Sequence, residues 1–507
     1  MTAALHRVAV THQNDQGRRL TPSRISRGAG LCAALAVLLY MMWPALWIRF
    51  GIIDDHDIID IIGHNARLPV LDIPTAVVSR LNEPLGRFRP VYWLGRVVES
   101  ATVGQHAGLW YFDRFLLSTV ALTAIYLTAV RFMAVLPGVL ISLLPFSGPQ
   151  FETWTRLGPN EAYAFPLMCI GLALTIRGIL RERSPAHLWV GYAFLALAAL
   201  AKENFLLVSV VMVAASALHF GLRKLGERDW WTVGTALALG LLNLVAVAVK
   251  STRYGSVYPL TRSLDSLESS YHFAVDNQNR YAYLYASVVL ALVMLAASYR
   301  RDISRRGLLR YTALVILLAA LQIAFYTGAP QAGRYLYPIA LVPVFVWGVV
   351  AVLCKGLVTG RVRALATSFV AITLLFPLAR GIEAARSNSE QSVKATAAFE
   401  TSLAKVEAAA VNSRADAIVL QPWEPSTDVE RVLSLARYIS TQTGVKVMTL
   451  PATHPSGEES RQLAVIIQNW STQGTARLDP YVPSQRCLSI VFGANRPVCS
   501  MSVPPPG

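Results

Sequence analysis

Two acidic clusters that follow a long apolar run are the residues of this sequence best suited to chemistry. The segment Asp54–Asp57 reads Asp-Asp-His-Asp and comes directly after the apolar run at 31–53, and the segment Asp60–His64 follows within two helical turns. Adjacent carboxylates repel each other, and one of them gains a raised pKa where the site is partly dry. Such a pair can act as a general base or help to hold a cation.

The two members of this acid pair have different surroundings if residues 54–64 form a helix. At about 100° per residue, Asp54, Asp57, Asp60 and His64 share a polar face, and four isoleucines cover the rest. A solvated face explains most of these acids, but Asp55 projects among the isoleucines, and we therefore assign a catalytic role to Asp54 and Asp55. His56 and its neighbours leave a divalent metal site open as an alternative.

Cationic residues recur in the other polar segments of the chain. Arginines at the ends of membrane spans often reach toward headgroups, but the segments that carry these residues fall on the side where the positive-inside bias depletes cations. Lys202, between two apolar runs, is a functional candidate by default. Arginine also matches the geometry of phosphate. The candidate substrate-binding residues are His56, Arg87, Arg89, Arg156, Glu161, Lys202, Arg334 and Tyr335.

The elements that position these residues are membrane helices. Of the 507 residues, 54% are hydrophobic and only 15% are charged, whereas soluble domains carry about 25% charged residues. We predict an α-helical polytopic membrane protein with about eleven transmembrane helices. The predicted spans are 31–53, 115–131, 132–146, 163–180, 188–201, 204–220, 231–249, 281–299, 308–327, 335–354 and 364–380.

The loops between these spans predict an orientation. The net charge of +16 could indicate a nucleic-acid partner, but excess Arg and Lys in a membrane protein belong in cytoplasmic loops. The basic clusters fall on one side when the spans alternate, and the candidate site residues fall on the other. The predicted parts are a cytoplasmic tail (1–29), a transmembrane domain (30–380) with outer loop 54–114, an extracytoplasmic domain (381–500) and a disordered tail (501–507).

The C-terminal region has the composition of a soluble domain. Helical stretches near 385–412, 428–441 and 458–472 alternate with strands near 417–420, 445–450 and 488–492, which predicts a small α/β domain. Cys487 and Cys499 have a spacing that permits either a disulfide or two free thiols.

These motifs together resemble a known family. A first span followed at once by paired acids in a long outer loop looks like the GT-C superfamily of membrane glycosyltransferases. The segments Arg-Leu-Gly-Pro-Asn-Glu at 156–161, Ala-Lys-Glu at 201–203 and Gly-Arg-Tyr-Leu-Tyr-Pro at 333–338 are similar to loops of bacterial members. The resemblance covers 31–380 and implies a polyprenyl-phosphate-linked sugar donor, a glycan or lipid acceptor in the cell envelope, and a bacterial inner-membrane location with the active site outside the cytoplasm.

The chemistry implied by this resemblance is an inverting displacement at an anomeric carbon. Asp54 or Asp55 would take the proton of the acceptor hydroxyl, while Arg334, Lys202, Arg156 and Arg89 would stabilise the departing phosphate. A lipid-phosphate donor needs no nucleotide site, and the sequence has no usual glycine-rich phosphate loop. No cofactor is implied with certainty, and a divalent cation is the open alternative.

Two other functions compete with this one. A polysaccharide polymerase or ligase would be expected to use Arg and His, with its large loop late in the membrane region, whereas the acid-rich loop here comes first. A lipid or glycan transporter would be expected to show internal repeats and acidic residues within its spans. The sequence has no convincing repeat, and most of its predicted spans lack carboxylates. The glycosyltransferase is therefore the favoured interpretation.

Overall fold

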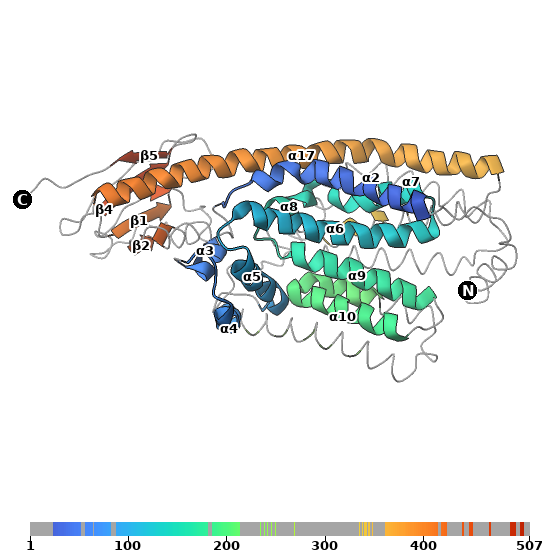
Figure 1. Ribbon diagram of the computed structural model, residues 1–507, viewed down its shortest axis with the longest axis horizontal. Coiled ribbons are helices and arrows are strands. Elements are labelled where there is room, and N and C mark those ends of the chain that lie inside the picture. The colour runs from blue at the N-terminus through green and yellow to red at the C-terminus, as the bar shows by residue number, and fades with distance from the viewer. Residues whose placement is uncertain are drawn as a thin grey trace, which may run out of the picture. The chain divides into compact units, whose positions relative to one another are not determined.

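The fold was examined in a computed structural model of the 507-residue chain (Figure 1). The structure describes the membrane helices of the first half, the long helix of the second half and the strands after it. The described residues are 24–51, 56–63, 65–82, 88–180, 185–212, 234, 238, 241, 245, 249, 268, 334, 337, 339–341, 343–344, 347, 360–413, 417–422, 439–440, 446–449, 466–467, 487–492 and 497–500.

The first membrane helix begins and ends earlier than the sequence predicts. Helix α2 spans Arg24–Met42, and a 3-10 turn, η1, continues it over Trp43–Trp47. The described residues after Trp47, as far as Gly51, are not helical. Pro44 explains the change, because proline lacks the N–H and its ring clashes with the preceding turn of an α-helix. The predicted span 31–53 is therefore corrected to 24–47, which is long enough to cross a bilayer.

A helical bundle follows this first helix. Helix α6 spans Ala107–Phe132, so it begins inside the predicted outer loop rather than at residue 115. Helix α9 (Glu161–Leu180) packs along α10 (Pro185–Ala201), as Figure 1 shows. The predicted span 132–146 corresponds to a shorter α-helix in the structure. Helix α7 covers Val135–Leu143, and the 3-10 turn η3 follows it over Leu144–Phe146.

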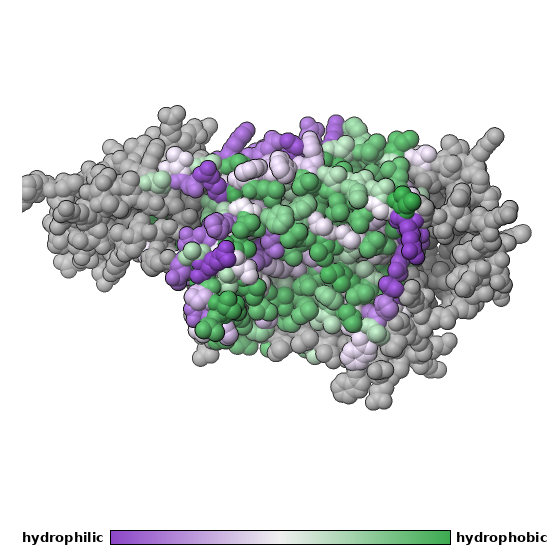
Figure 2. Space-filling view, viewed as in Figure 1, coloured by the Kyte–Doolittle hydropathy of each residue, from purple (hydrophilic) through white to green (hydrophobic). Residues whose placement is uncertain are grey.

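The opposite ends of these helices have different characters. The hydroxyl of Tyr126, near the end of α6, donates a hydrogen bond of 2.7 Å to the carbonyl of Arg27, near the start of α2. The predicted basic clusters around Arg27 and Arg131 therefore lie at one end of the bundle, as expected from alternating spans. Hydrophobic side chains gather along the middle of α2, α6 and α9, with hydrophilic ones at their ends (Figure 2). In the described part of the chain, Arg24–Trp47 and Ala107–Phe132 are apolar and long enough to span a membrane.

Helix α17 joins two regions that the sequence predicts to be separate. It runs without interruption over Gly360–Ser413, so the predicted span 364–380 and the polar helix 385–412 form one helix. Near its middle it contacts α2, where the hydroxyl of Ser389 donates to the carbonyl of Met41 at 2.9 Å and Arg386 stacks on Tyr40. The large apolar side chains of Ile372, Leu375 and Phe376 are exposed, as expected for a lipid-facing surface.

The acidic segment forms a short helix whose faces agree with the prediction. Helix α3 spans His56–Ile62, and all four of its isoleucines are buried while Asp60 is exposed. The helix ends before residue 64 because Gly63 adopts φ of 64°, a left-handed conformation that caps a helix and that glycine adopts readily. The rest of the predicted loop 54–114 is mainly helical, with η2 over Val70–Asp72, α4 over Ile73–Asn82 and α5 over Pro90–Thr102.

The chain divides into two compact units. The first holds most of the helical bundle, and the second holds parts of the predicted outer loop together with the C-terminal region. The first unit comprises Met1–Trp43, Val77–Gly95 and Phe112–Ser389, and the second comprises Pro44–Ala76, Arg96–Tyr111 and Glu390–Gly507. The domain limits expected from the sequence stay a prediction.

The C-terminal strands form one five-stranded sheet in the order β2-β1-β3-β4-β5. Strand β1 is parallel to β2, β3 and β4, and β5 is antiparallel to β4. The strands are β1 (Ala417–Pro422), β2 (Lys446–Thr449), β3 (Ile466–Ile467), β4 (Cys487–Phe492) and β5 (Pro497–Ser500). Parallel neighbours need crossover connections, and the helices predicted near 428–441 and 458–472 lie outside the described residues except at Ile439–Ser440 and β3. The α/β domain therefore stays a prediction.

Two local findings refine the sequence analysis of this sheet. Strand β3 lies within the stretch predicted as a helix at 458–472, where the β-branched residues Val465, Ile466 and Ile467 favour a strand. The register places Cys499 opposite Ile490, three positions along the strand from Cys487. Three residues of strand span about 10 Å, and a disulfide needs Cα atoms within about 7 Å. The choice between a disulfide and two free thiols stays a prediction.

Candidate functional site: a buried charge cluster where the membrane helices break

The candidate site lies in the first unit, where the apolar helices α9 and α10 meet polar loops. Helix α10 ends at Ala201, Lys202 has an extended backbone (φ −151°, ψ 123°), and the 3-10 turn η5 over Glu203–Phe205 leads into the next helix. This confirms the break that the sequence predicts. Because backbone groups at such a break leave the helical ladder, their segment can carry polar side chains into an otherwise apolar bundle.

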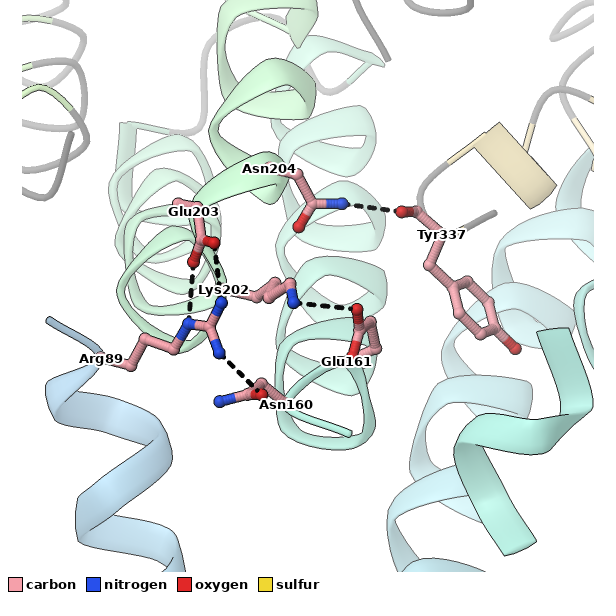
Figure 3. Close-up of polar contacts among 7 residues, drawn as sticks. All are labelled: Arg89, Asn160, Glu161, Lys202, Glu203, Asn204 and Tyr337. Carbon is pink, nitrogen blue, oxygen red and sulfur yellow. Dashed lines mark hydrogen bonds and ion pairs between the residues drawn. The ribbon is translucent and has the colours of Figure 1, made fainter. Parts of the chain in front are cut away.

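A guanidinium and a carboxylate form a paired contact at the centre of the cluster. The Nε and Nη2 atoms of Arg89, just before helix α5, donate hydrogen bonds of 2.8 and 2.7 Å to the two oxygens of Glu203 (Figure 3). The Nη1 atom donates a further bond of 2.9 Å to Oδ1 of Asn160. The side chains of Arg89 and Glu203 are only 11% and 4% exposed. Paired hydrogen bonds of this kind combine strength with a fixed geometry.

A second ion pair lies beside the first. The Nζ atom of Lys202 is 3.2 Å from Oε1 of Glu161, the first residue of α9 (Figure 3). Both side chains are buried, and the negative charge of Glu161 is favoured at a helix N-terminus. The two pairs contribute two positive and two negative formal charges, so the four side chains are together neutral. Burying them without their partners would cost several kcal/mol per ion.

Two oxygen atoms in this cluster lack a hydrogen-bond donor within the described part of the chain. They are Oε2 of Glu161 and Oδ1 of Asn204, and both residues are fully buried. The amide nitrogen of Asn204 is engaged, since it donates 2.7 Å to the carbonyl of Tyr337 (Figure 3). Buried acceptors are normally satisfied, so these two atoms suit a water molecule or a ligand that brings hydroxyl or amine donors.

The remaining sequence candidates differ in what the structure says of them. Arg156 ends the short helix α8 (Glu152–Thr155) and pairs with Glu152 at 2.8 Å, with its own side chain 47% exposed. Arg334 is half-buried. His56 begins helix α3, but its side chain lies outside the described part. The candidates Asp54, Asp55, Arg87 and Tyr335 also lie outside the described residues, so their roles stay predictions.

Several polar residues of this region are not among the sequence candidates. Asn160 and Glu203 occur in the motifs at 156–161 and 201–203, and Asn204 follows the second motif directly. A carboxylate or amide next to an intramembrane lysine is a signal for such a polar cluster. Arg114, inside α6, is also fully buried, and its Nη2 donates 2.7 Å to the hydroxyl of Tyr163. The charged pair Asp113-Arg114 within an otherwise apolar stretch of α6 was the available signal. Among the described residues, no group of three or more metal-ligating side chains comes together.

Comparison with known proteins identifies the fold. No protein-family model and no curated protein sequence matches this chain. The crystal structure of ArnT from Cupriavidus metallidurans in the apo state is similar over 82% of this chain and 85% of that one, with a TM-score of 0.51 and 13% sequence identity. The chain shares the fold of ArnT. At 13% identity, this likeness is one of fold.

A second solved structure gives a weaker likeness. The Archaeoglobus fulgidus oligosaccharyltransferase, tethered to an acceptor peptide, matches 85% of this chain and 64% of its own with 11% identity. Its TM-score of 0.46 is below the level at which a shared fold can be argued. The fold assignment therefore depends on the first comparison.

Proposed function

We propose that this protein is a membrane glycosyltransferase. It would move a sugar from a polyprenyl-phosphate donor to a glycan or lipid acceptor of the cell envelope, on the outer face of the membrane. The observation that carries this proposal is the buried charge cluster of Arg89, Glu161, Lys202 and Glu203. It lies at a break in the helices of a chain that shares the fold of ArnT over most of both proteins. Charges held inside a membrane protein in this way mark functional sites.

The proposed reaction is a single displacement. One of Asp54 and Asp55 accepts the proton of the acceptor hydroxyl, and that oxygen forms a bond to the anomeric carbon of the sugar. The bond from the anomeric carbon to the phosphate oxygen breaks, and the lipid phosphate leaves with the electron pair. The configuration at the anomeric carbon is inverted. Cations beside the phosphate stabilise the negative charge of the leaving group.

Burial divides the four candidate cations into two kinds. Arg89 and Lys202 form buried ion pairs with carboxylates, and we assign them to holding the site together. Arg334 is half-buried, and Arg156 is 47% exposed in its pair with Glu152, so we assign these two more accessible arginines to the donor phosphate. Glu161 and Asn204 each present a buried oxygen that accepts no hydrogen bond within the described part, and hydroxyls of the donor sugar would supply the missing donors.

The proposed base is tested with the purified protein in proteoliposomes. The donors would be undecaprenyl-phosphate-linked pentoses and hexoses, and the acceptor pool would be a lipid and glycan extract of the cell envelope. Asp54→Asn and Asp55→Asn should reduce transfer by roughly 100-fold or more for the residue that is the base, since general base catalysis contributes about 10² to 10⁴. Asp60→Asn is the matched control, because Asp60 is an exposed carboxylate on helix α3, close by in the sequence, and it should retain wild-type transfer.

Two results would overturn parts of this proposal. If both Asn variants keep near wild-type transfer, neither residue is the base. If the wild-type protein transfers no sugar from any of these donors, and no lipid-linked sugar accumulates in cells lacking the gene, the glycosyltransferase assignment itself fails.

A further inference from the structure

Tyr337 is a fully buried residue at which several polar segments of the first unit meet. Its hydroxyl donates a hydrogen bond of 2.7 Å to the carbonyl of Pro145 and accepts one of 3.2 Å from Nε1 of Trp154. Its own carbonyl accepts the bond of 2.7 Å from Asn204 (Figure 3). Its ring packs against Phe165 with ring centroids 4.4 Å apart. Both polar ends of the residue are therefore held in place.

The same residue closes the turn that carries Arg334. The backbone N–H of Tyr337 donates 3.2 Å to the carbonyl of Arg334, three residues earlier. The backbone position of Arg334 is thus tied to a residue whose side-chain hydroxyl and backbone carbonyl are both hydrogen-bonded. The side chain of arginine is long and flexible, and ordering it costs conformational entropy. A fixed backbone sets the point from which the side chain extends, and this restricts the region that the guanidinium can reach.

The partners of Tyr337 also belong to the segments that carry the other candidate cations. Trp154 lies two residues before Arg156, in helix α8. Asn204 lies two residues after Lys202, in the break between α10 and the helix that follows. One tyrosine therefore links three segments that are far apart in the sequence and that each carry a predicted phosphate ligand.

We propose that Tyr337 is a positioning residue for donor binding. It holds the Arg334 turn in register with the segments of Arg156 and Lys202, so that the guanidinium of Arg334 meets the phosphate of the lipid donor. This inference rests on the proposed function, which assigns Arg334 to the phosphate. A displacement of about 1 Å in such a site can cost about 100-fold in rate, and the loss of the Tyr337 hydroxyl frees both Trp154 and the Pro145 carbonyl.

The test is a double-mutant cycle on the binding of a defined lipid. The purified full-length protein in detergent is titrated with undecaprenyl phosphate, and undecaprenol serves as the lipid without the phosphate. The variants are Tyr337→Phe, Arg334→Ala and the two combined. Tyr126→Phe is the matched control, since it also removes a tyrosine hydrogen bond of 2.7 Å to a backbone carbonyl, at the Arg27 end of the bundle.

The expected result separates positioning from general stability. Tyr337→Phe should raise the Kd for undecaprenyl phosphate about tenfold, leave undecaprenol binding unchanged, and have less than a twofold effect once Arg334 is alanine. Tyr126→Phe should leave both dissociation constants unchanged. If Tyr337→Phe does not fold, Trp154→Phe removes one of the same hydrogen bonds and enters the same cycle.

Two contrary results have different meanings. If Arg334→Ala raises the Kd but the effects of the two substitutions multiply, Tyr337 does not act through Arg334 and the positioning role is wrong. If Arg334→Ala leaves the Kd unchanged, the assignment of Arg334 to the phosphate is wrong, and the proposed function loses its donor site.

Discussion

Replacing Arg89 by glutamine distinguishes a structural role of this residue from a role in binding the donor. The substitution removes the positive charge of Arg89 and its two hydrogen bonds from the carboxylate of Glu203, which is only 4% exposed, and it removes the bond to Asn160. Breaking a buried ion pair on one side costs about 3–5 kcal/mol. Since each 1.4 kcal/mol is a factor of ten, the unfolding equilibrium should shift by roughly 100-fold to 4,000-fold.

A second variant and a control identify the cause of this loss. Combining Arg89→Gln with Glu203→Gln also removes the buried negative charge, so most of the lost free energy of unfolding should return. Arg156→Gln breaks the pair with Glu152, in which the arginine side chain is 47% exposed, and it should cost no more than about 1 kcal/mol. The free energy of unfolding is measured by titrating the purified protein with SDS in mixed micelles while tryptophan fluorescence is followed.

The reasoning would be refuted by either of two outcomes. A single variant within about 1 kcal/mol of the wild type would mean that the pair does not stabilise the fold to the extent its burial implies. A double variant as unstable as the single one would mean that the loss does not come from the buried charge of Glu203. If Arg89→Gln instead weakens the binding of undecaprenyl phosphate and leaves stability unchanged, Arg89 is a ligand of the donor after all.

Two further predictions concern packing and the C-terminal sheet. Gly191→Ala should destabilise the protein by about 1–3 kcal/mol, because the added Cβ atom would lie 2.8 Å from the backbone nitrogen of Thr175 on α9. In the control variant Gly28→Ala, the added Cβ atom meets nothing within 4 Å, so the variant should be neutral or stabilise by up to about 1 kcal/mol. Equal midpoints of SDS unfolding for Gly191→Ala and Gly28→Ala would contradict the tight contact between α9 and α10. Cys487 and Cys499 should both react with maleimide in the unfolded chain without a reducing agent, and a mass showing a disulfide between them would rule out the observed register.

Several features of the fold could be predicted from the sequence because they depend on residues close together in the chain. Apolar runs of sufficient length indicated membrane helices, and α2, α6, α9 and α10 lie where such runs occur. Isoleucine spacing predicted the buried face of α3, and a charged triplet between two apolar runs predicted the helix break at Lys202. The errors were local as well. Pro44 ended the first α-helix early, and Gly63 ended α3 before residue 64.

The sequence by itself determined that this protein carries charged residues at the ends and breaks of apolar helices, because hydrophobic periodicity and charge are properties of neighbouring positions. Which of these charges meet was decided only by the tertiary structure. Arg89 and Glu203 are 114 positions apart, and Tyr337 reaches Trp154 across 183. No local pattern encodes such pairs; they form because a buried charge or hydrogen-bonding group must find a partner inside the bundle. That requirement places Arg89 and Lys202 in buried ion pairs, whereas Arg156 and Arg334 are the more accessible candidates.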